Sequence, residues 1–318
     1  MTASPLKGAV GTADGIRRDS GFADTSPAVY FDVLEPDRPT GKPPVVMVHG
    51  GGHTGTCYLA TPDGRPGWAA YFARRGHRVF VPDWPGMGRS GFMAGPALTG
   101  EVVCRALGGL IESVGEPVVL MTHSMSGVYG WKLVETHGAH IRAVVGVAPS
   151  GPGDVQPQAE VISRDENEVV VRRAGGARRI SFTALTPPEP DFIRAKFLGP
   201  DSTRFPMAAL DFYARGLGYT PPRLMFERQN VDGAQLRVTD IAPFRGKRIL
   251  VVTGACDVDH TREIDGAVVD WLGKIGAAVE FRFLADEGID GNGHMVMLEQ
   301  NSDEIAGIIA DWVESATG

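Results

Sequence analysis

The feature that most constrains this chain is a short apolar run, 118–123, that ends at a serine among small residues. Ser124 follows the run and precedes a segment able to form a helix. A strand, a sharp turn and a helix present the serine hydroxyl at the apex, beside the positive end of the helix dipole. Thr122 and Ser126 stand where the strictest form of this pattern has glycines. The motif alone therefore also fits a serine that caps a helix after a buried strand.

Short apolar runs alternate with helix-length segments along most of the chain. Strands are expected at 28–34, 45–48, 79–81, 118–122, 141–147, 248–253 and 279–284. Helices are expected at 68–75, at 99–114, after the strand 118–122 up to about residue 137, at 263–275 and at 302–315. Continuous apolar strands joined by helical crossovers are typical of a mainly parallel sheet that is covered by helices on both faces. The pattern therefore predicts an α/β fold.

This alternation stops after Pro149 and returns at Arg248. The intervening segment is richer in proline, arginine and mixed patterns. Its expected elements are a hairpin over 169–180 that turns at Gly175-Gly176, and short helices over 192–198 and 207–217. The sequence therefore predicts a core of residues 1–149 and 244–318, with a cap or lid of residues 150–243 inserted between the sixth and seventh strands.

Charge and cysteine usage exclude several classes of protein. The net charge of −7 leaves no reason to expect nucleic acid as a partner, since such proteins present a basic face. Cys57, Cys104 and Cys256 form neither a disulfide framework nor a metal-binding spacing. The first 15 residues lack an apolar core of signal-peptide length, and the longest apolar runs are strand-sized. We expect a soluble, cytoplasmic protein without membrane partner, metal or cofactor.

Acyl transfer by a serine needs a base, an acid that orients the base, and donors for the oxyanion. In a chain of this layout the order is serine, acid, histidine. His294, in a Gly-Asn-Gly-His loop after the last strand, is the candidate base, and the alternative is a histidine of a surface loop. Asp257 follows strand 248–253 and is the candidate acid, with Asp259 as the second choice. Both carboxylates equally suit a cap for the helix that follows.

Backbone amides are the expected oxyanion donors, because they are held rigidly. One is the amide of Met125, the residue after the serine. The other is expected from the glycine loop 50–52, where Gly51 is the first choice and Gly52 the second. Among the other histidines, His49 is expected to brace this loop and His123 to point away from the site, whereas His53 and His260 are candidates for its border.

Several motifs fall in the order found in α/β-hydrolase-fold serine hydrolases, and over residues 28 to 316 the chain resembles that superfamily. It is most similar to a group of bacterial esterases. The shared motifs are His49-Gly-Gly-Gly-His-Thr-Gly55, Thr61-Pro-Asp-Gly-Arg-Pro-Gly-Trp68, the His123-Ser-Met-Ser-Gly127 turn and Gly291-Asn-Gly-His-Met295. The resemblance implies an α/β-hydrolase fold, a serine nucleophile at Ser124 with His294 as base, and a possible homodimer.

The chain departs from these esterases at one position. Their acid is a glutamate at the end of the sixth strand, just before Pro-Ser-Gly-Pro, whereas this chain has Ala148 before Pro149-Ser-Gly-Pro152. An alanine cannot orient a histidine. Either the role has moved to Asp257, the usual place in the wider superfamily, or hydrolysis is impaired, and we favour the move.

The expected reaction is cleavage of a carboxylic ester or lactone through an acyl-enzyme. The alternatives are a C–C hydrolase or lyase that uses the same site, and a non-catalytic protein that binds a small molecule. The inserted segment is expected to select the substrate, with an apolar ceiling drawn from Phe192, Phe197, Phe205, Met207, Phe212, Tyr213, Tyr219, Leu224, Met225 and Phe226. The alternative is that the insertion packs on a small core of its own, and some of these residues are expected to do so. Its arginines fit either the solvated face of a hairpin or the attraction of an acidic substrate; they are Arg164, Arg172, Arg173, Arg178 and Arg179.

Overall fold

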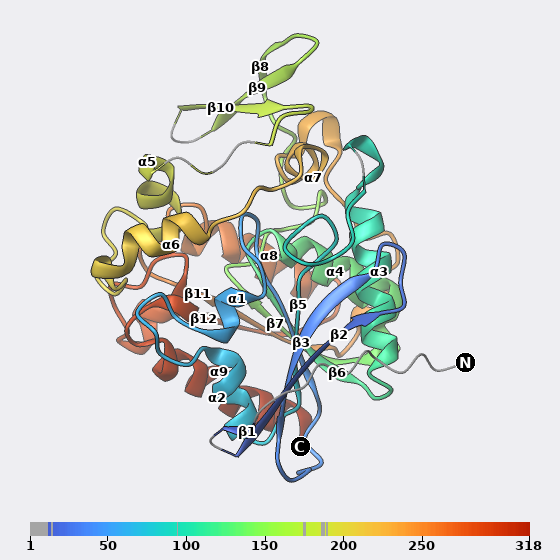
Figure 1. The fold of residues 1–318 in the computed structure, drawn as a ribbon. Coiled ribbons are helices and arrows are strands. Elements are labelled where there is room, and N and C mark those ends of the chain that lie inside the picture. The colour runs from blue at the N-terminus through green and yellow to red at the C-terminus, as the bar shows by residue number, and fades with distance from the viewer. Residues whose placement is uncertain (1–11, 14, 94, 174–175, 186–187, 189) are drawn as a thin grey trace.

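The computed structural model describes residues 12–13, 15–93, 95–173, 176–185, 188 and 190–318. A nine-stranded sheet runs through its centre in the order β1-β2-β3-β5-β4-β6-β7-β11-β12 (Figure 1). Its strands are β1 (Thr12–Ala13), β2 (Ile16–Ala23), β3 (Val29–Pro36), β4 (Val45–Val48), β5 (Val79–Pro82), β6 (Val118–His123), β7 (Ile141–Val147), β11 (Arg248–Thr253) and β12 (Ala278–Phe283). In this spatial order, neighbouring strands from β5 to β12 pair in parallel, whereas the β1–β2, β2–β3 and β3–β5 pairs are antiparallel. The predicted mainly parallel sheet is confirmed.

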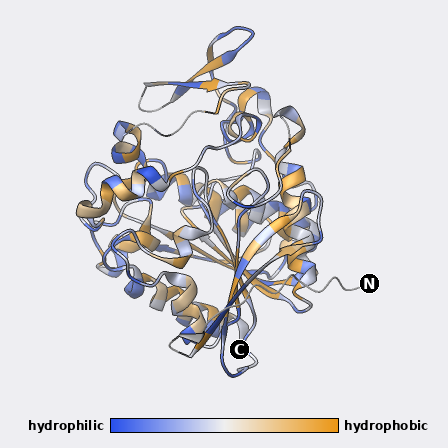
Figure 2. Cartoon of the chain, viewed as in Figure 1, coloured by the Kyte–Doolittle hydropathy of each residue, from blue (hydrophilic) through white to orange (hydrophobic). Residues whose placement is uncertain are grey.

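Helices cover both faces of the sheet, because successive side chains of a strand point to opposite sides. Val45 and Met47 of β4 belong to the apolar cluster formed with α2 and α9, whereas Val46 and Val48 belong to the cluster formed with α3, α4 and α8. Figure 2 shows the hydrophobic colours concentrated on these central strands. The helices of this region are α1 (Thr56–Leu59), α2 (Trp68–Arg74), α3 (Gly100–Ser113), α4 (Ser126–His137), α8 (Arg262–Lys274) and α9 (Ser302–Thr317), with the single turns η1 (Gly95–Ala97), η2 (Gly138–His140), η6 (Ala242–Phe244), η7 (Leu284–Glu287) and η8 (Val296–Leu298).

A separate group of elements is inserted between β7 and β11. Counted from β2, these are the sixth and seventh strands of the sheet, as predicted, and the two-residue β1 adds one strand at the edge. The inserted elements are β8 (Val161–Arg164), β9 (Glu168–Arg173), β10 (Gly176–Ser181), α5 (Pro190–Phe192), η3 (Ile193–Leu198), η4 (Met207–Ala209), α6 (Leu210–Gly216), α7 (Pro222–Arg228) and η5 (Val231–Gly233). The hairpin of β9 and β10 pairs as expected, whereas Gly175 of its expected turn lies outside the described residues. The domain boundaries at 150 and 243 stay a prediction.

The sequence did not indicate every element. The eight-residue β2 lies in a stretch that had no clear pattern, because Arg17, Arg18, Asp19 and Ser20 place polar residues on both sides of a strand near the sheet edge. The short strand β8 is exposed along its whole length and carries no alternation of apolar residues either. No helix in the described part of the chain is both long and apolar enough to cross a membrane.

The carboxyl ends of the parallel strands meet at one edge of the sheet. His123, the last residue of β6, lies opposite Val147, the last of β7, and Val147 lies opposite Val252 of β11. Two backbone bonds continue this alignment past the strand ends, from the Ser124 amide to the Val147 carbonyl and from the Ala148 amide to the Val252 carbonyl. Loops that follow these strands therefore meet, as at the ligand-binding edge of open α/β sheets.

Candidate active site

Ser124 lies in a strained turn between β6 and α4. Its φ is +53°, in the left-handed region that residues other than glycine rarely adopt. Its carbonyl accepts hydrogen bonds from the amides of Gly127 (2.8 Å) and Ser150 (2.9 Å), which hold the turn. A Cβ at position 127 would lie 2.6 Å from the Ser150 nitrogen, so this close approach needs glycine. The sequence motif thus folds into the predicted strand-turn-helix, with its serine at the apex.

The second small residue of the motif, Ser126, fixes the turn through its hydrogen bonds. Ser126 is fully buried, and its Oγ accepts a hydrogen bond from the His123 amide (2.9 Å). The same hydroxyl lies 2.9 Å from the carbonyl oxygens of both Val48 and His123, to which it donates. A serine in place of the more usual glycine therefore ties the ends of β4 and β6 together. This contact explains how the departure from the strict motif is accommodated.

His294 and Asp257 form a buried pair at the same edge of the sheet. His294 Nδ1 lies 2.5 Å from Asp257 Oδ2, and the side chains of both residues are almost inaccessible to solvent. The two loops meet through a hydrogen bond from the Cys256 amide to the Asn292 carbonyl (2.8 Å). A Cβ at Gly254 would lie 2.3 Å from the Gly293 carbonyl oxygen, so a larger residue there would push the loops apart.

Electrostatics fix the protonation states of this pair. Burial raises the pKa of Asp257, but the charge of His294 and its hydrogen bond outweigh it and bring the pKa to about 2. Burial lowers the pKa of His294, and the attraction of Asp257 offsets only part of that effect. At neutral pH an ionised Asp257 therefore accepts the Nδ1 proton of a neutral His294. Nε2 is left free to accept a proton, as a general base requires.

The geometry distinguishes the two candidate acids. Asp257 faces His294, and its Oδ1 also accepts hydrogen bonds from the amides of Asp259 (3.0 Å) and His260 (3.1 Å). Asp259 instead forms an ion pair with Lys196 of the insertion. Ala148, at the position where the similar esterases have glutamate, is buried and leaves β7 with a φ of +44°. A carboxylate after β11 thus occupies the place beside the histidine.

Phe197 connects the His294 ring with the cavity that Ser124 lines. Phe197 stacks on the His294 ring, with 6.4 Å between ring centroids, and lines the same cavity as Ser124. The described residues contain no hydrogen bond between the Ser124 hydroxyl and the His294 ring, whose Nδ1 bonds to Asp257. Such bonds are often long without substrate and tighten when it binds.

Two free backbone amides line the cavity next to Ser124. Within the described residues, the amides of Gly51 and Met125 have no hydrogen-bond partner, and both residues line the cavity. The Gly52 amide, in contrast, donates to Thr220 Oγ1 (2.9 Å), and the Gly52 carbonyl accepts from the Gly218 amide (2.8 Å). Gly51 and Met125 are therefore placed to bind an oxyanion, whereas Gly52 is already bonded to the insertion.

His49 and His53 support this loop, and His123 packs against His294. His49 Nδ1 bonds to the Gly50 carbonyl (2.8 Å), which confirms its expected bracing contact. His53 Nδ1 bonds to the Gly51 carbonyl (2.9 Å), and its Nε2 lies 2.8 Å from the Tyr213 hydroxyl of α6. The expectation that His123 points away from the site is wrong. Its ring packs against that of His294 at 4.6 Å, and its Nε2 bonds to the His294 carbonyl (3.1 Å).

The loop that carries His294 is held by a buried glutamate that the sequence gave no reason to select. Glu299 is fully buried and accepts hydrogen bonds from the Gly293 amide (2.8 Å), the Asn292 side chain and the Ser202 hydroxyl (3.4 Å). Burial raises the pKa of Glu299 to about 7, against the opposing effect of these bonds. Glu299 thus fixes the backbone immediately before His294.

The Thr61–Trp68 motif contacts the chain segment directly after Glu299. Arg65 Nη2 donates to the Glu299 carbonyl (2.9 Å), and Nη1 reaches the Ser302 hydroxyl (3.2 Å). Trp68 Nε1 donates to the Ser302 carbonyl (2.9 Å). The motif is therefore a support for the start of α9 and the histidine loop rather than part of the cavity.

Replacing Glu299 with glutamine should change the pH dependence of stability. The folded pKa of about 7 exceeds the ordinary value of 4.5, so the folded state binds this proton more tightly than the unfolded state. The contribution of Glu299 to stability is therefore full below about pH 4.5 and declines as pH rises to about 7. Glu299→Gln keeps an acceptor for the Gly293 amide and has no proton to lose. The melting temperature of the variant relative to wild type should rise across this interval, and a constant difference would contradict the assignment.

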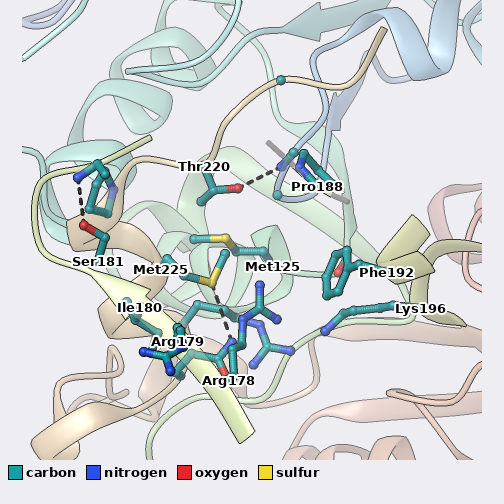
Figure 3. Close-up of a pocket in the computed structure, with 18 of the residues that line it drawn as sticks. Met125, Arg178, Arg179, Ile180, Ser181, Pro188, Phe192, Lys196, Thr220 and Met225 are labelled. Atoms are coloured by element: carbon teal, nitrogen blue, oxygen red, sulfur yellow. Dashed lines mark hydrogen bonds between the residues drawn. The ribbon is translucent and has the colours of Figure 1, made fainter. Parts of the chain in front are cut away.

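A cavity of about 580 Å³ opens above Ser124, between the sheet edge and the insertion (Figure 3). Of the aromatic and apolar residues expected to form its ceiling, Phe192, Phe197 and Met225 line it. Phe205, Tyr213 and Leu224 are instead buried in the core, and Met207, Phe212 and Tyr219 are exposed. The expected ceiling is thus wrong for most of its members, because the insertion uses several of them to pack on itself or on the sheet domain.

Comparison with known proteins places these features in a family. Residues 45–308 match the model of the alpha/beta hydrolase family. In an alignment 352 positions long, the chain is 24% identical to the "Probable secreted lipase phiG" of Fungal sp. (strain ATCC 74256). The alignment covers 90% of this chain and 85% of that protein. Over 101 residues, 31% of this chain and 39% of the relative, it is 33% identical to a carbendazim hydrolyzing esterase of Nocardioides sp. (strain SG-4G).

Solved structures agree on the fold. A bacterial esterase aligns over 99% of this chain and 100% of its own, with a TM-score of 0.58 and 17% identity. A serine hydrolase involved in carbazole degradation, the CarC enzyme, aligns over 93% of this chain and 98% of its own, with a TM-score of 0.59 and 17% identity. The fold predicted from the sequence is confirmed, and the chain belongs to the alpha/beta hydrolase family.

Proposed function

We infer that this protein hydrolyses a carboxylic ester or lactone, with Ser124 as nucleophile, His294 as base, Asp257 as the acid that orients it, and the Gly51 and Met125 amides as oxyanion donors. The observation that carries the proposal is the buried hydrogen bond of 2.5 Å between His294 and Asp257, formed at the sheet edge that bears Ser124. Lipase and esterase relatives support the same class of reaction.

Each group has a defined part in the proposed reaction. Ser124 Oγ attacks the carbonyl carbon while His294 Nε2 takes the hydroxyl proton, and the negative charge that develops on the carbonyl oxygen is held by the Gly51 and Met125 amides. Collapse of this intermediate breaks the bond to the leaving oxygen, which takes the proton from His294. Water then loses a proton to His294 and attacks the acyl carbonyl. As the bond between the acyl group and Ser124 Oγ breaks, His294 returns this proton to Oγ and the acid is released.

The sheet domain and the insertion have different roles in this proposal. Residues 1–149 and 244–318 supply the five groups named above, and residues 150–243 form a cap that roofs the cavity. Support comes from the cavity lining, which combines Phe192, Thr220 and Met225 of the insertion with Ser124 and Met125 of the sheet domain. A cytoplasmic location and a homodimer remain predictions from the sequence and its resemblance.

Hydrolysis of 4-nitrophenyl butyrate as a function of pH tests the proposal. The purified wild-type protein should release 4-nitrophenol, because the cavity admits a short acyl chain. Catalysis needs neutral His294, whose pKa is lowered by burial below its usual 6.5. The acid limb of kcat/KM should therefore fall below pH 6.5, since this limb reports the free enzyme's base. An acid limb well above pH 7 would exclude this histidine as the base, and a folded protein without ester hydrolysis would overturn the proposal.

A further inference from the structure

Basic side chains gather on the cap side of the cavity above Ser124. Arg178 and Arg179 come from β10, Lys196 from η3 and Arg228 from the end of α7. Of the described residues that line this cavity, Glu168 is the acidic one, and it pairs with Arg179. Figure 3 shows Arg178 and Arg179 side by side, with the Lys196 side chain extending toward them.

Three of these cations also line a second cavity of about 800 Å³. Arg178, Lys196 and Arg228 are shared by both cavities, together with Phe192. The cations therefore stand at the junction of the two spaces. The acidic residues of the second cavity, Asp259 and Glu263, are absent from the lining of the first, so the side that faces Ser124 is the more positive.

Aromatic, neutral polar and acidic groups contact these cations. The Phe192 ring lies 5.0 Å from the Arg178 guanidinium and 5.6 Å from Lys196 Nζ, so one aromatic ring positions two like charges. Arg228 Nη1 donates to the neutral side-chain oxygen of Gln156 (3.2 Å). Lys196 pairs with Asp259. All three side chains are half-buried, where charge interactions are screened less than on an open surface.

This positive region is close to the reacting groups. Lys196 is followed by Phe197, which stacks on the His294 ring. Burial lowers the pKa of His294, and the charge of Lys196 lowers it further, so the lysine acts electrostatically on the base. Ser124, Met125 and Gly51 line the same cavity as Arg178 and Arg228. A single small molecule can therefore reach the serine and the cations together.

We propose that the substrate is an anionic ester, whose acyl carbonyl lies at Ser124 while a carboxylate or phosphate elsewhere in the molecule binds Arg178, Lys196 and Arg228. This inference rests on the proposed ester hydrolysis and names the substrate class of that site. A guanidinium presents parallel N–H donors that match the paired oxygens of a carboxylate or phosphate. The cap thus selects for charge and orients the ester, whereas the aromatic residues alone would select only for apolar surface.

The structure also separates these cations from other arginines of the three-stranded sheet β10-β9-β8. Arg172 pairs with Glu160 and Arg164 with Asp232, and neither lines either of these two cavities. The side chain of Arg173 lies outside the described residues. Arg172 is therefore a matched control, since it carries the same charge on the adjacent strand β9 and lines neither cavity.

The test compares two substrates that differ in one charge, mono-4-nitrophenyl adipate and its neutral methyl ester. The wild-type protein should prefer the acid, measured as the ratio of the two kcat/KM values. Arg178→Gln and Arg228→Gln should each lower this ratio about tenfold to a hundredfold, as expected for loss of a hydrogen bond to a charged group. Arg172→Gln should leave the ratio at the wild-type value. Added salt should lower the wild-type ratio, because screening weakens the attraction.

The outcomes separate failure of this inference from failure of the proposed reaction. If the wild-type protein hydrolyses both esters equally well and the variants keep that ratio, the anion inference is overturned while ester hydrolysis stands. If it hydrolyses neither, the proposed function fails, and calorimetry with the non-hydrolysable mono-anilide of adipic acid and its methyl ester still decides whether the cavity binds anions. Variants that change only inhibition by the acid product would assign the cations to product binding and contradict the proposal. Competition by adipate or by inorganic phosphate identifies the preferred anion.

Discussion

Replacing Ser124 with alanine is expected to lower kcat for 4-nitrophenyl butyrate on the order of a million-fold, the loss seen when a serine nucleophile is removed from a comparable catalytic group. Alanine at this position adopts the same positive φ as the native serine, so the turn between β6 and α4 should persist. The hydroxyl is the one group lost. Thr220, which also lines the cavity, has a hydroxyl that already accepts a hydrogen bond from the Gly52 amide.

The residual rate and a control variant make this prediction specific. The oxyanion donors and the cavity remain in Ser124→Ala, so a small rate above that of buffer should survive. Ser113→Ala provides the control, because the Ser113 hydroxyl bonds to the Leu110 carbonyl at the end of α3 and does not line the cavity. Its rate should equal that of the wild type. A Ser124→Ala protein that is folded by circular dichroism and keeps a substantial rate would remove Ser124 from the mechanism.

Replacing Asp257 with asparagine should lower kcat about ten-thousand-fold, with little change in KM. Asparagine has nearly the same shape, but it is neutral and can present an N–H to the ring. The histidine then loses both the charge that stabilises its protonated state and the acceptor that fixes the Nδ1–H tautomer. Because the pair is buried, no water shell replaces that acceptor.

Asp259→Asn is the matched comparison for this prediction. Asp259 lies two residues away and pairs with Lys196 rather than with His294. Its variant should hydrolyse a neutral ester close to the wild-type rate. If Asp259→Asn loses activity and Asp257→Asn retains it, the acid has been assigned to the wrong carboxylate. If both variants retain activity, His294 works without either carboxylate. Neither aspartate then takes the role of the glutamate that the similar esterases have at the position of Ala148.

Local patterns were enough to predict the fold and to select Ser124 and His294 as candidates. The apolar strands, their helical crossovers and the turn at Ser124 are set by residues close together in the chain. The loop of His294 is similarly marked by its glycines, of which Gly293 is required because a Cβ there would lie 1.7 Å from the Leu198 carbonyl oxygen. Such local signals are present because, in natural sequences, the conformational preference of each segment agrees with its place in the fold.

Choices between near neighbours depended on contacts that no local pattern contains. The sequence favoured Asp257 over Asp259, but only the folded chain brings His294 to the first and Lys196 to the second. Gly51 and Gly52 differ in the same way, because Thr220, 168 residues later, takes the Gly52 amide. Arg178 was named from the sequence together with four other arginines of the insertion, but the pattern did not distinguish it from them. Alternation along a hairpin shows which residues share a face, but it does not show which face meets the cavity.

The most direct test of the central claim, that Ser124 is an activated nucleophile, is the mass of the protein after reaction with a fluorophosphonate, followed by peptide mapping. The account predicts one phosphonyl group per chain, located on Ser124, and strongly reduced labelling in His294→Ala because the base is absent. A folded wild-type protein that stays unlabelled, or a label on another serine, would contradict the account.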